Sequence, residues 1–463
     1  MQRDSASFRD PSGHVFMSEE MVFRTIRRPY ADHWAYLRAC GLLDAVVQSG
    51  MLFPFEELPL RDWPGPCHDA EVLAVLRTNR LPFISYPYEW CFSQLRAAAL
   101  LTLDMHLLAL KHGCVLKDAS AYNVQFLKGK PVFIDILSFE RWVEGRPWEA
   151  YGQFCTHFLA PLALMSLCDV RCGMLHRQWI DGIPLDLASR LLPLRSRLSP
   201  SLAMHIHLHA SMREKHGDAR LSAAKAKSVR LDAQRLRDVA QSLRDVVQSL
   251  HAPRQATEWG NYYTDTNYTP VARAAKEQAV RDMAARHGGH LALDLGANTG
   301  AFSVLLAPSF DTVLATDVDH TAMERLWNKP PPENVLPLLL DLSSPSPAIG
   351  WACLERPSFF QRCRADWVSA LALCHHLRIT AGIPLPNILT MMASLLTENG
   401  VCLLEFVPKE DSQVQRLLSR REDIFDDYSK STLRECLPSA GLRVLESITL
   451  PESVRTLYLL GRA

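Results

Sequence analysis

The sequence lacks several features that would place it in a broad class at once. It has 12 cysteines but no Cys-x-x-Cys pair, which argues against common zinc and dithiol motifs and favours reduced thiols. No apolar run reaches the roughly 18 residues of a membrane span. No charged stretch followed by an apolar one opens the sequence, so no secretory signal is expected. We therefore expect a cytoplasmic protein without a membrane partner.

An excess of charge of one sign is also missing. Lys plus Arg and Asp plus Glu total 50 each, so no long-range field draws the chain toward nucleic acid. Apolar residues make up 48% and charged residues 22%, which is ordinary for folded soluble proteins. A length of 463 residues is too great for one typical core and predicts two or three domains. The composition therefore predicts a folded, multidomain protein and no nucleic-acid partner.

Differences in composition and in the pattern of apolar residues divide the chain into three parts. Residues 1–202 mix short strand-like runs, such as 15–16 and 21–26, with helical runs such as 95–112. Residues 203–256 are polar, and within them 236–243 is nearly repeated at 243–250. This offset of one heptad places Leu236, Leu243 and Leu250 on one helical stripe, which predicts a helical connector. Residues 257–463 form the expected third part.

Strand and helix patterns alternate along this third part. Such alternation predicts an α/β domain with a mainly parallel sheet and helices on both faces. Only residues 451–455 separate the last two strand patterns, which is too short for a parallel crossover, so these strands should be antiparallel. The expected strands are 291–295, 312–316, 335–340, 367–373, 401–406, 444–450 and 456–460.

The sharpest motif is Leu293-Asp-Leu-Gly-Ala-Asn-Thr-Gly300, between an apolar strand and a helical pattern. Gly296 and Gly300 leave room for a ligand against the backbone. The dinucleotide pattern Gly-x-Gly-x-x-Gly is not met, because Asn298 stands where a pyrophosphate needs the second glycine. Asp294 would repel pyrophosphate and suits a ligand with an ammonium group. The motif therefore favours a nucleoside ligand without phosphates.

Two further acids follow the next two expected strands. Asp317 lies 21 positions after Gly296, close to the ~20 expected for a carboxylate that binds ribose hydroxyls. Asp341 follows the third strand and is placed to accept a hydrogen bond from an adenine amino group. Both acids are therefore candidate ligands of a nucleoside.

Residues 291–341 resemble the class I S-adenosylmethionine-dependent methyltransferase family, through this loop and the two acids in order. The terminal strand pair is similar to the hairpin that closes that family's seven-stranded Rossmann-like sheet. The resemblance implies S-adenosylmethionine as cofactor, bound by Asp294, Gly296, Asn298, Gly300, Asp317 and Asp341. The family's middle glycine is Asn298 here. A Rossmann-like fold without activity is the alternative.

Candidate residues for the acceptor side follow the fourth and fifth strands. His375 and His376 lie at the first position, and either is a candidate general base near its unperturbed pKa. Glu405 ends the fifth strand. No metal site is expected, since consecutive residues rarely converge on one ion. The Asn-Pro-Pro-Tyr motif of nucleic-acid amino methyltransferases is missing. Ahead of the domain, residues 258–268 include Tyr263 and read as a lid over the cofactor or as an aromatic linker.

The N-terminal part carries a second resemblance, to the protein kinase superfamily. Asp118, Asn123 five positions later, and Asp135 at a strand end are similar to its catalytic loop and metal-binding strand. However, no lysine precedes Lys111 and no glycine-rich phosphate loop is present. The resemblance therefore implies a degenerate α+β kinase-like domain in which phosphoryl transfer is not expected.

The whole chain resembles bacterial methyltransferases with an N-terminal Lys-Asp-Ala-Ser-x-Tyr-Asn motif, some of them labelled nodulation proteins. We interpret the chain as a methyltransferase acting on a small-molecule or glycan-type acceptor. A protein with a working N-terminal phosphotransferase and a non-catalytic scaffold protein are the alternatives. The sequence does not determine the acceptor or the oligomeric state.

Overall fold

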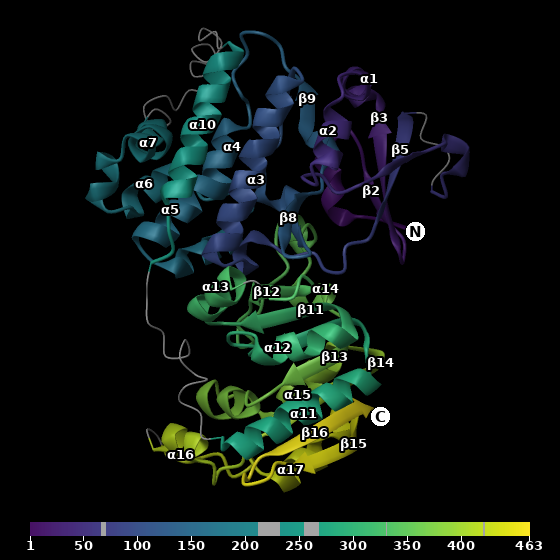
Figure 1. Ribbon diagram of the computed structural model, residues 1–463, viewed down its shortest axis with the longest axis vertical. Coiled ribbons are helices and arrows are strands. Elements are labelled where there is room, and N and C mark those ends of the chain that lie inside the picture. Colours follow the sequence, from purple (N-terminus) through teal and green to yellow (C-terminus); the bar gives the residue numbers. More distant parts are fainter. Residues whose placement is uncertain (66–70, 212–231, 254–267, 330, 420–421) are drawn as a thin grey trace. The chain divides into compact units, whose positions relative to one another are not determined.

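The protein is described by a computed structural model that covers residues 1–65, 71–211, 232–253, 268–329, 331–419 and 422–463. It divides into two units (Figure 1). The first comprises Met1–Arg254 and Ala348–Arg356, and the second comprises Gln255–Pro347 and Pro357–Ala463. The division between residues 254 and 255 falls two residues before the boundary expected from the sequence.

The first unit begins with an antiparallel sheet of five strands in the order β1-β2-β3-β5-β4. The strand-like runs expected at 15–16 and 21–26 are confirmed as β2 and β3. Phe23 on β3 and Val75 on β5 pack with Trp63 in one buried hydrophobic cluster. The strands are β1 (Gln2–Arg3), β2 (Val15–Met17), β3 (Met21–Arg27), β4 (Glu56–Leu58) and β5 (Val72–Asn79).

Two helices form the centre of this unit. Helix α3 (Phe92–Lys111) confirms the helix expected over 95–112, and α10 (Ala233–Ser249) packs along it (Figure 1). The predicted stripe of Leu236, Leu243 and Leu250 is buried. The helix of the expected connector therefore packs within the first unit. The other helices are α1 (Ala31–Ala39), α2 (Leu42–Gln48), α4 (Tyr151–Phe154), α5 (Ala160–Leu167), α6 (Leu185–Leu191) and α7 (Pro200–Leu202).

Two small strand pairs follow α3. Strand β6 (Cys114–Leu116) pairs with β9 (Phe139–Arg141), and β7 (Val124–Leu127) pairs with β8 (Lys130–Phe133). These pairs determine where the candidate kinase-like residues lie, since two of them fall between β6 and β7 and one follows β8.

A short segment from the C-terminal half of the sequence, Ala348–Arg356, belongs to the first unit. Glu355 is buried there and accepts two hydrogen bonds from Arg9, at 3.0 and 2.7 Å. The guanidinium of Arg356 lies over the ring of Tyr122, 4.5 Å from its centroid. The second unit is therefore discontinuous in sequence, which no local pattern in the sequence indicates.

The second unit contains one sheet of seven strands in the order β12-β11-β10-β13-β14-β16-β15. The first five are parallel, and β16 runs antiparallel to both neighbours, which confirms the predicted terminal hairpin. The strands are β10 (Gly289–Leu295), β11 (Phe310–Asp317), β12 (Val335–Leu339), β13 (Ala365–Ala370), β14 (Leu396–Phe406), β15 (Leu442–Thr449) and β16 (Thr456–Arg462).

Helices cover both faces of this sheet. The chain moves from β10 toward one edge and from β13 toward the other, so right-handed crossovers place the connecting helices on opposite faces. Helix α11 contacts α12, and α15 contacts α17, as this arrangement requires (Figure 1). The helices are α11 (Pro270–Arg286), α12 (Ala301–Leu306), α13 (His320–Asn328), α14 (Phe359–Arg362), α15 (Leu385–Ser394), α16 (Ser412–Leu418) and α17 (Lys430–Cys436).

The carboxyl end of β13 differs from the expectation. Strand β13 stops at Ala370 rather than continuing to residue 373, because the backbone turns there and Ala372 takes a left-handed conformation with φ of 51°. This turn brings Leu371 and Ala372 to the end of the sheet where the glycine loop also lies.

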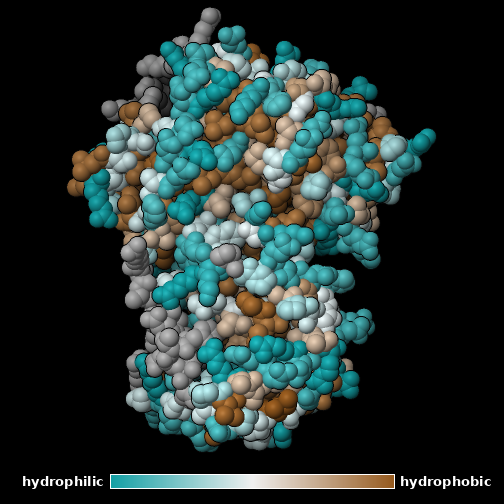
Figure 2. Space-filling model, in the orientation of Figure 1, coloured by the Kyte–Doolittle hydropathy of each residue, from teal (hydrophilic) through white to brown (hydrophobic). Residues whose placement is uncertain are grey.

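Hydrophilic residues cover much of the face that Figure 2 shows. No helix in the described part of the chain combines the length and the apolar character that a membrane crossing requires.

Candidate active site

The loop between β10 and α12 turns sharply at three residues. Gly296, Asn298 and Gly300 have φ values of 70°, 51° and 79°, in the left-handed region that favours glycine and tolerates asparagine. A Cβ on Gly300 would lie 2.6 Å from a methyl carbon of Leu326, which is too close without a shift. The predicted glycine positions are therefore required by backbone conformation and, at Gly300, by packing.

Asp294 is the last but one residue of β10, and only 2% of it is exposed. Its Oδ1 accepts a hydrogen bond from the Ser369 hydroxyl at 2.7 Å, and its Oδ2 accepts one from the Ser303 hydroxyl at 2.6 Å. Burial raises the pKa of Asp294, and the two serine hydroxyls oppose that change. The carboxyl group is thus held in one orientation at the base of the loop.

Asp317 and Asp341 lie at the carboxyl ends of β11 and β12, on the same edge of the sheet. Asp317 accepts hydrogen bonds from the backbone N–H groups of Asn298 and Asp319, both at 2.8 Å. Burial raises the pKa of Asp317 to about 6. Asp341 accepts from the N–H and hydroxyl of Ser343, at 2.8 and 2.6 Å. Asp317 is therefore tied directly to the glycine loop, whereas Asp341 is engaged in a local turn.

A pocket of about 530 Å³, a volume that includes adjoining solvent, opens beside the loop. It lies where the sheet reverses its order, between β10 and β13, the place where open α/β sheets bind ligands. Its lining combines the end of β10, the glycine loop, the start of α12, the turn after β13, and helix α11 with Tyr268 two residues ahead of it. The lining residues are Tyr268, Arg273, Lys276, Asp294, Gly296, Ala297, Asn298, Phe302, Leu371 and Ala372.

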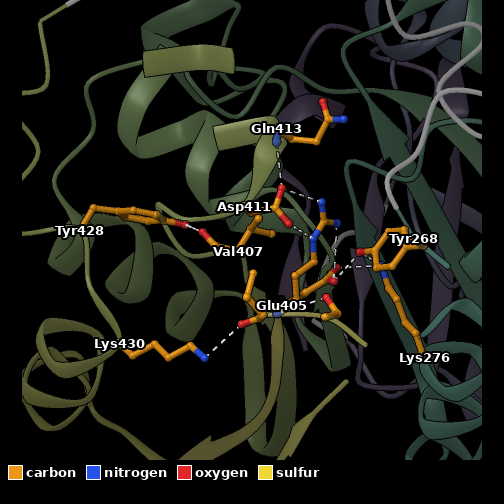
Figure 3. Close-up of polar contacts among 11 residues, drawn as sticks. Tyr268, Lys276, Glu405, Val407, Asp411, Gln413, Tyr428 and Lys430 are labelled. Carbon is orange, nitrogen blue, oxygen red and sulfur yellow. Dashed lines mark hydrogen bonds and ion pairs between the residues drawn. The ribbon is translucent and has the colours of Figure 1, made fainter. Parts of the chain in front are cut away.

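One wall of this pocket is held by a buried hydrogen-bonded group (Figure 3). Lys276 on α11 donates to Glu405 Oε2 at 2.7 Å and to the Tyr268 hydroxyl at 3.0 Å. The Tyr268 hydroxyl also bonds Glu405 Oε1. Lys276 is 3% exposed and Glu405 fully buried. Burial lowers the pKa of Lys276, and the Glu405 carboxylate opposes that change. Glu405 therefore reaches the pocket only through Lys276 and Tyr268.

A second ion pair adjoins the first. Arg455, 1% exposed, bonds the two carboxylate oxygens of Asp411 at 2.7 and 3.1 Å. Its guanidinium also lies 4.3 Å from the ring centroid of Tyr268 and 3.9 Å from Glu405 Oε1. The two cations and two carboxylates balance, which is how buried charges are tolerated.

The paired histidines after β13 are not among the lining residues of the described pocket. His375 is 2% exposed, and burial lowers its pKa well below the usual value. Burial also lowers the pKa of His376 to about 4. A pKa near the unperturbed value is therefore not found at either position, because the turn after β13 buries His375 and half-buries His376. A catalytic role of either histidine stays a prediction. Tyr263, the candidate lid residue, lies outside the described residues.

Several site residues were missed in the sequence. Lys276 and Arg273 lie on an ordinary polar helix, and nothing local distinguishes them from surface residues. Arg455 fell in a segment that was read only as a short turn. Ser303 and Ser369 do not belong to a recognisable sequence motif. Only the periodic spacing of α11 ahead of β10 could have indicated that one face of this helix meets the loop.

The comparisons with known proteins agree with this geometry. Residues 277–447 match the model of a methyltransferase domain family. The chain is 35% identical over 470 aligned residues to nodulation protein NoeA of Rhizobium meliloti (strain 1021), covering 100% of this chain and 96% of the relative. The chain belongs to the NoeA family. Its second unit is an S-adenosylmethionine-dependent methyltransferase, as the matched domain and the glycine loop together indicate.

Two solved structures are also similar to this NoeA-family protein. The N-methyltransferase NodS from Bradyrhizobium japonicum WM9 with S-adenosyl-L-homocysteine has 15% identity and a TM-score of 0.33, covering 45% of this chain and 93% of that chain. Magnesium protoporphyrin IX methyltransferase from Synechocystis PCC 6803 with bound SAH has 16% identity and a TM-score of 0.32, covering 44% and 93%.

Proposed function

We propose that the second unit transfers a methyl group from S-adenosylmethionine to a small-molecule or glycan-type acceptor. The observation that carries this proposal is the pocket at the reversal point of the sheet, with the glycine loop on one side and a carboxyl group at its base. The balanced charge of the chain supports an acceptor that is not a polyanion. The relative is named as a nodulation protein, a label that suggests a small-molecule or glycan-type acceptor.

Residues that line the pocket, and two carboxylates on the same edge of the sheet outside its lining, could hold the parts of this cofactor. Gly296 leaves the pocket wall without a side chain, where the ligand must approach the backbone. Asp294 suits the ammonium of the amino-acid end, and Arg273, which lines the pocket and pairs with Glu277 at 3.1 Å, would face its carboxylate. Asp317 would accept from the ribose hydroxyls, while Asp341 would face the adenine.

The acceptor would enter at the carboxyl ends of β13 and β14. S-adenosylmethionine supplies an electrophilic methyl group when bound, so the protein's task is mainly to align the acceptor atom. A histidine with a pKa of about 4 is uncharged at neutral pH and keeps one ring N–H. His376 and His375 are therefore proposed as neutral hydrogen-bonding groups on this side, while Glu405 would act through Tyr268.

Binding of S-adenosylhomocysteine tests the proposal, through its dependence on pH. Only the ionised Asp317 carboxylate accepts two ribose hydroxyls, so affinity should fall as pH decreases through about 6, the pKa of Asp317. Asp317→Asn should bind about tenfold more weakly at pH 7.5 and lose this dependence, as expected for hydrogen bonds to a charged group. Calorimetry between pH 5 and 8 measures both effects.

The matched control is Asp311→Asn, at the exposed opposite end of the same strand, where Asp311 pairs with His290 at 2.7 Å. It should bind like the wild type. No measurable binding of S-adenosylhomocysteine by the wild type, or equal binding by Asp317→Asn, would refute the site.

For the first unit we propose a kinase-like fold that does not bind magnesium nucleotide. Asp118 bonds Asn123 through its side chain, and burial, with the nearby charge of Asp135, raises the pKa of Asp118. Asp135 is already paired with the guanidinium of Arg24, 2.6 Å from its Oδ1, and its Oδ2 accepts from Ser138 at 2.5 Å. A cation of the chain itself thus neutralises the carboxylate that a metal would need.

We expect calorimetric titration of the full chain with magnesium-ATP to show no binding at micromolar concentrations. The physical reason is that a metal would have to displace a partly buried guanidinium from its carboxylate. Micromolar binding that disappears in Asp135→Ala would contradict this expectation. Arg24→Gln is the companion variant, because it removes the guanidinium that pairs with Asp135 and leaves the negative charge of the Asp135 carboxylate in place.

A further inference from the structure

Two buried serine hydroxyls face the carboxyl group of Asp294 at the base of the pocket. Ser369 donates to Oδ1 of Asp294 at 2.7 Å, and Ser303 donates to Oδ2 at 2.6 Å. Both serines are completely buried, and neither is among the lining residues of the described pocket. Their hydroxyls therefore serve this carboxyl group and do not meet a ligand themselves.

The two hydroxyls come from different elements of the fold. Ser369 on β13 stands directly opposite Asp294 in the register of β10 and β13. Ser303 lies in the first turn of α12, which begins immediately after the glycine loop. A hydrogen bond on each oxygen prevents the carboxyl group from rotating about its Cβ–Cγ bond. The strand pairing and the helix start thus fix the plane of the carboxyl group.

These donors also act on the charge of Asp294. Burial raises the pKa of Asp294, whereas the hydrogen bonds from Ser303 and Ser369 lower it, because hydroxyl donors stabilise the ionised form. The charged groups that face this carboxyl group are Lys276 on α11, which also lowers its pKa, and Asp317 at the end of β11. Lys276 already pairs with Glu405 at 2.7 Å. The serines are therefore the donors dedicated to Asp294.

An ionised Asp294 still has capacity for a ligand. A carboxylate has about four acceptor positions. The two hydroxyls and the backbone N–H of Ser303 occupy at most three of them. Asp294 lines the pocket, so the remaining position is available to a donor there. A negative charge at this point attracts an ammonium, whereas a protonated carboxyl group does not.

We propose that Ser303 and Ser369 are positioning residues, which keep Asp294 ionised and oriented toward the ammonium at the amino-acid end of the cofactor. This inference rests on the proposed function of the pocket and deepens it. It assigns the distinction between ligands with and without an ammonium to two serines outside the pocket lining.

The test compares two probes that share the nucleoside and the thioether sulfur. S-adenosylhomocysteine carries the amino-acid end, and 5′-methylthioadenosine lacks it. Both probes carry the ribose, so the ratio of their affinities cancels the effect of Asp317 and isolates that of Asp294. This ratio should fall as pH decreases through the pKa of Asp294, because the ammonium needs the ionised carboxylate. Calorimetry between pH 5 and 8 measures the ratio.

Ser303→Ala/Ser369→Ala should raise the pKa of Asp294, because burial is then opposed by fewer donors. The loss of the affinity ratio should therefore occur at least about one pH unit higher than in the wild type, the effect of one hydrogen bond to a charged group. Below both midpoints the ratio should be about tenfold lower. Each single variant should shift the midpoint in the same direction, which keeps the test available if the double variant does not fold.

Two controls separate positioning from a general structural role. Ser346→Ala should leave the ratio unchanged, since Ser346 is 1% exposed and its hydroxyl has no hydrogen-bond partner in the described part of the chain. Asp294→Asn is uncharged at every pH. Adding both serine replacements to Asp294→Asn should therefore not change the ratio further. Thermal unfolding of each variant checks that the chain is folded.

Three results would overturn the inference: a wild-type pH profile in the folded double variant, an equal loss of affinity for both probes, or a further fall of the ratio in the Asp294→Asn background. Equal binding of both probes by the wild type would also overturn it, while leaving the nucleoside site in place. A wild type that binds neither probe would instead remove the proposed function on which the inference rests.

Discussion

Gly296→Val is expected to lower the affinity for S-adenosylhomocysteine at least about 100-fold, which corresponds to about 2.8 kcal/mol. The backbone φ of 70° at Gly296 is unfavourable for any side chain and most of all for a β-branched one. Its new Cβ would also lie 3.2 Å from Leu373 Cδ1, and the branched methyl groups would enter the pocket that Gly296 lines. Both effects remove the space in which the cofactor meets the loop.

Gly441→Val is the matched control for this substitution. Gly441 has a φ of 71°, and a Cβ there would meet no atom within 4 Å. Both variants therefore carry similar backbone strain, and both should unfold at a lower temperature than the wild type. Only Gly296→Val should lose the ligand. If both variants bound S-adenosylhomocysteine equally well, the loop would not be the cofactor site.

Asp411→Ala is expected to lower the free energy of unfolding by about 3–5 kcal/mol, the usual effect of removing one partner of a buried ion pair. Arg455 is 1% exposed, so its guanidinium would remain buried without its main carboxylate. Asp411 also caps α16 by accepting from the N–H of Gln413 at 2.9 Å, a further contribution of about 1 kcal/mol. Urea-induced unfolding followed by circular dichroism measures the change.

An exposed ion pair provides the comparison. Glu446 pairs with Arg286 at 2.7 Å, with both side chains substantially exposed, so Glu446→Ala should cost less than about 1 kcal/mol. Adding Arg455→Met to Asp411→Ala should recover much of the lost stability, because no unpaired charge then remains. An Asp411→Ala protein as stable as Glu446→Ala would show that this pair contributes little to folding.

The strand pattern of the second unit could be predicted closely because each strand carries its own signal. A buried parallel strand such as β10 is an apolar run, and its partner β11 repeats that signal after a helical pattern. The antiparallel hairpin followed from chain length alone, since residues 451–455 cannot span a crossover. That Ala348–Arg356 packs in the first unit could not be predicted, because its ion pair between Glu355 and Arg9 joins residues more than 300 positions apart.

The residues of the candidate site likewise fall into those that the sequence predicted and those that it did not. Gly296, Asn298 and Gly300 were found because a sharp turn after a strand needs particular residue types at neighbouring positions. No sequence pattern indicates the ion pair between Lys276 and Glu405, since 129 residues separate them. The histidines were found, but their protonation was predicted wrongly, because the pKa of an imidazole depends on burial.

The sequence by itself determined the loop that turns at Gly296, the acids at three strand ends and the family to which the chain is similar. These features are local, so short-range sterics and spacing specify them. The tertiary structure alone decided which side chains form the wall of the pocket and in which charge state they stand. Folding brings Tyr268, Lys276 and Glu405 together and buries Lys276 and Glu405. Coulomb interactions between such groups become strong enough to orient a hydroxyl because water is excluded there.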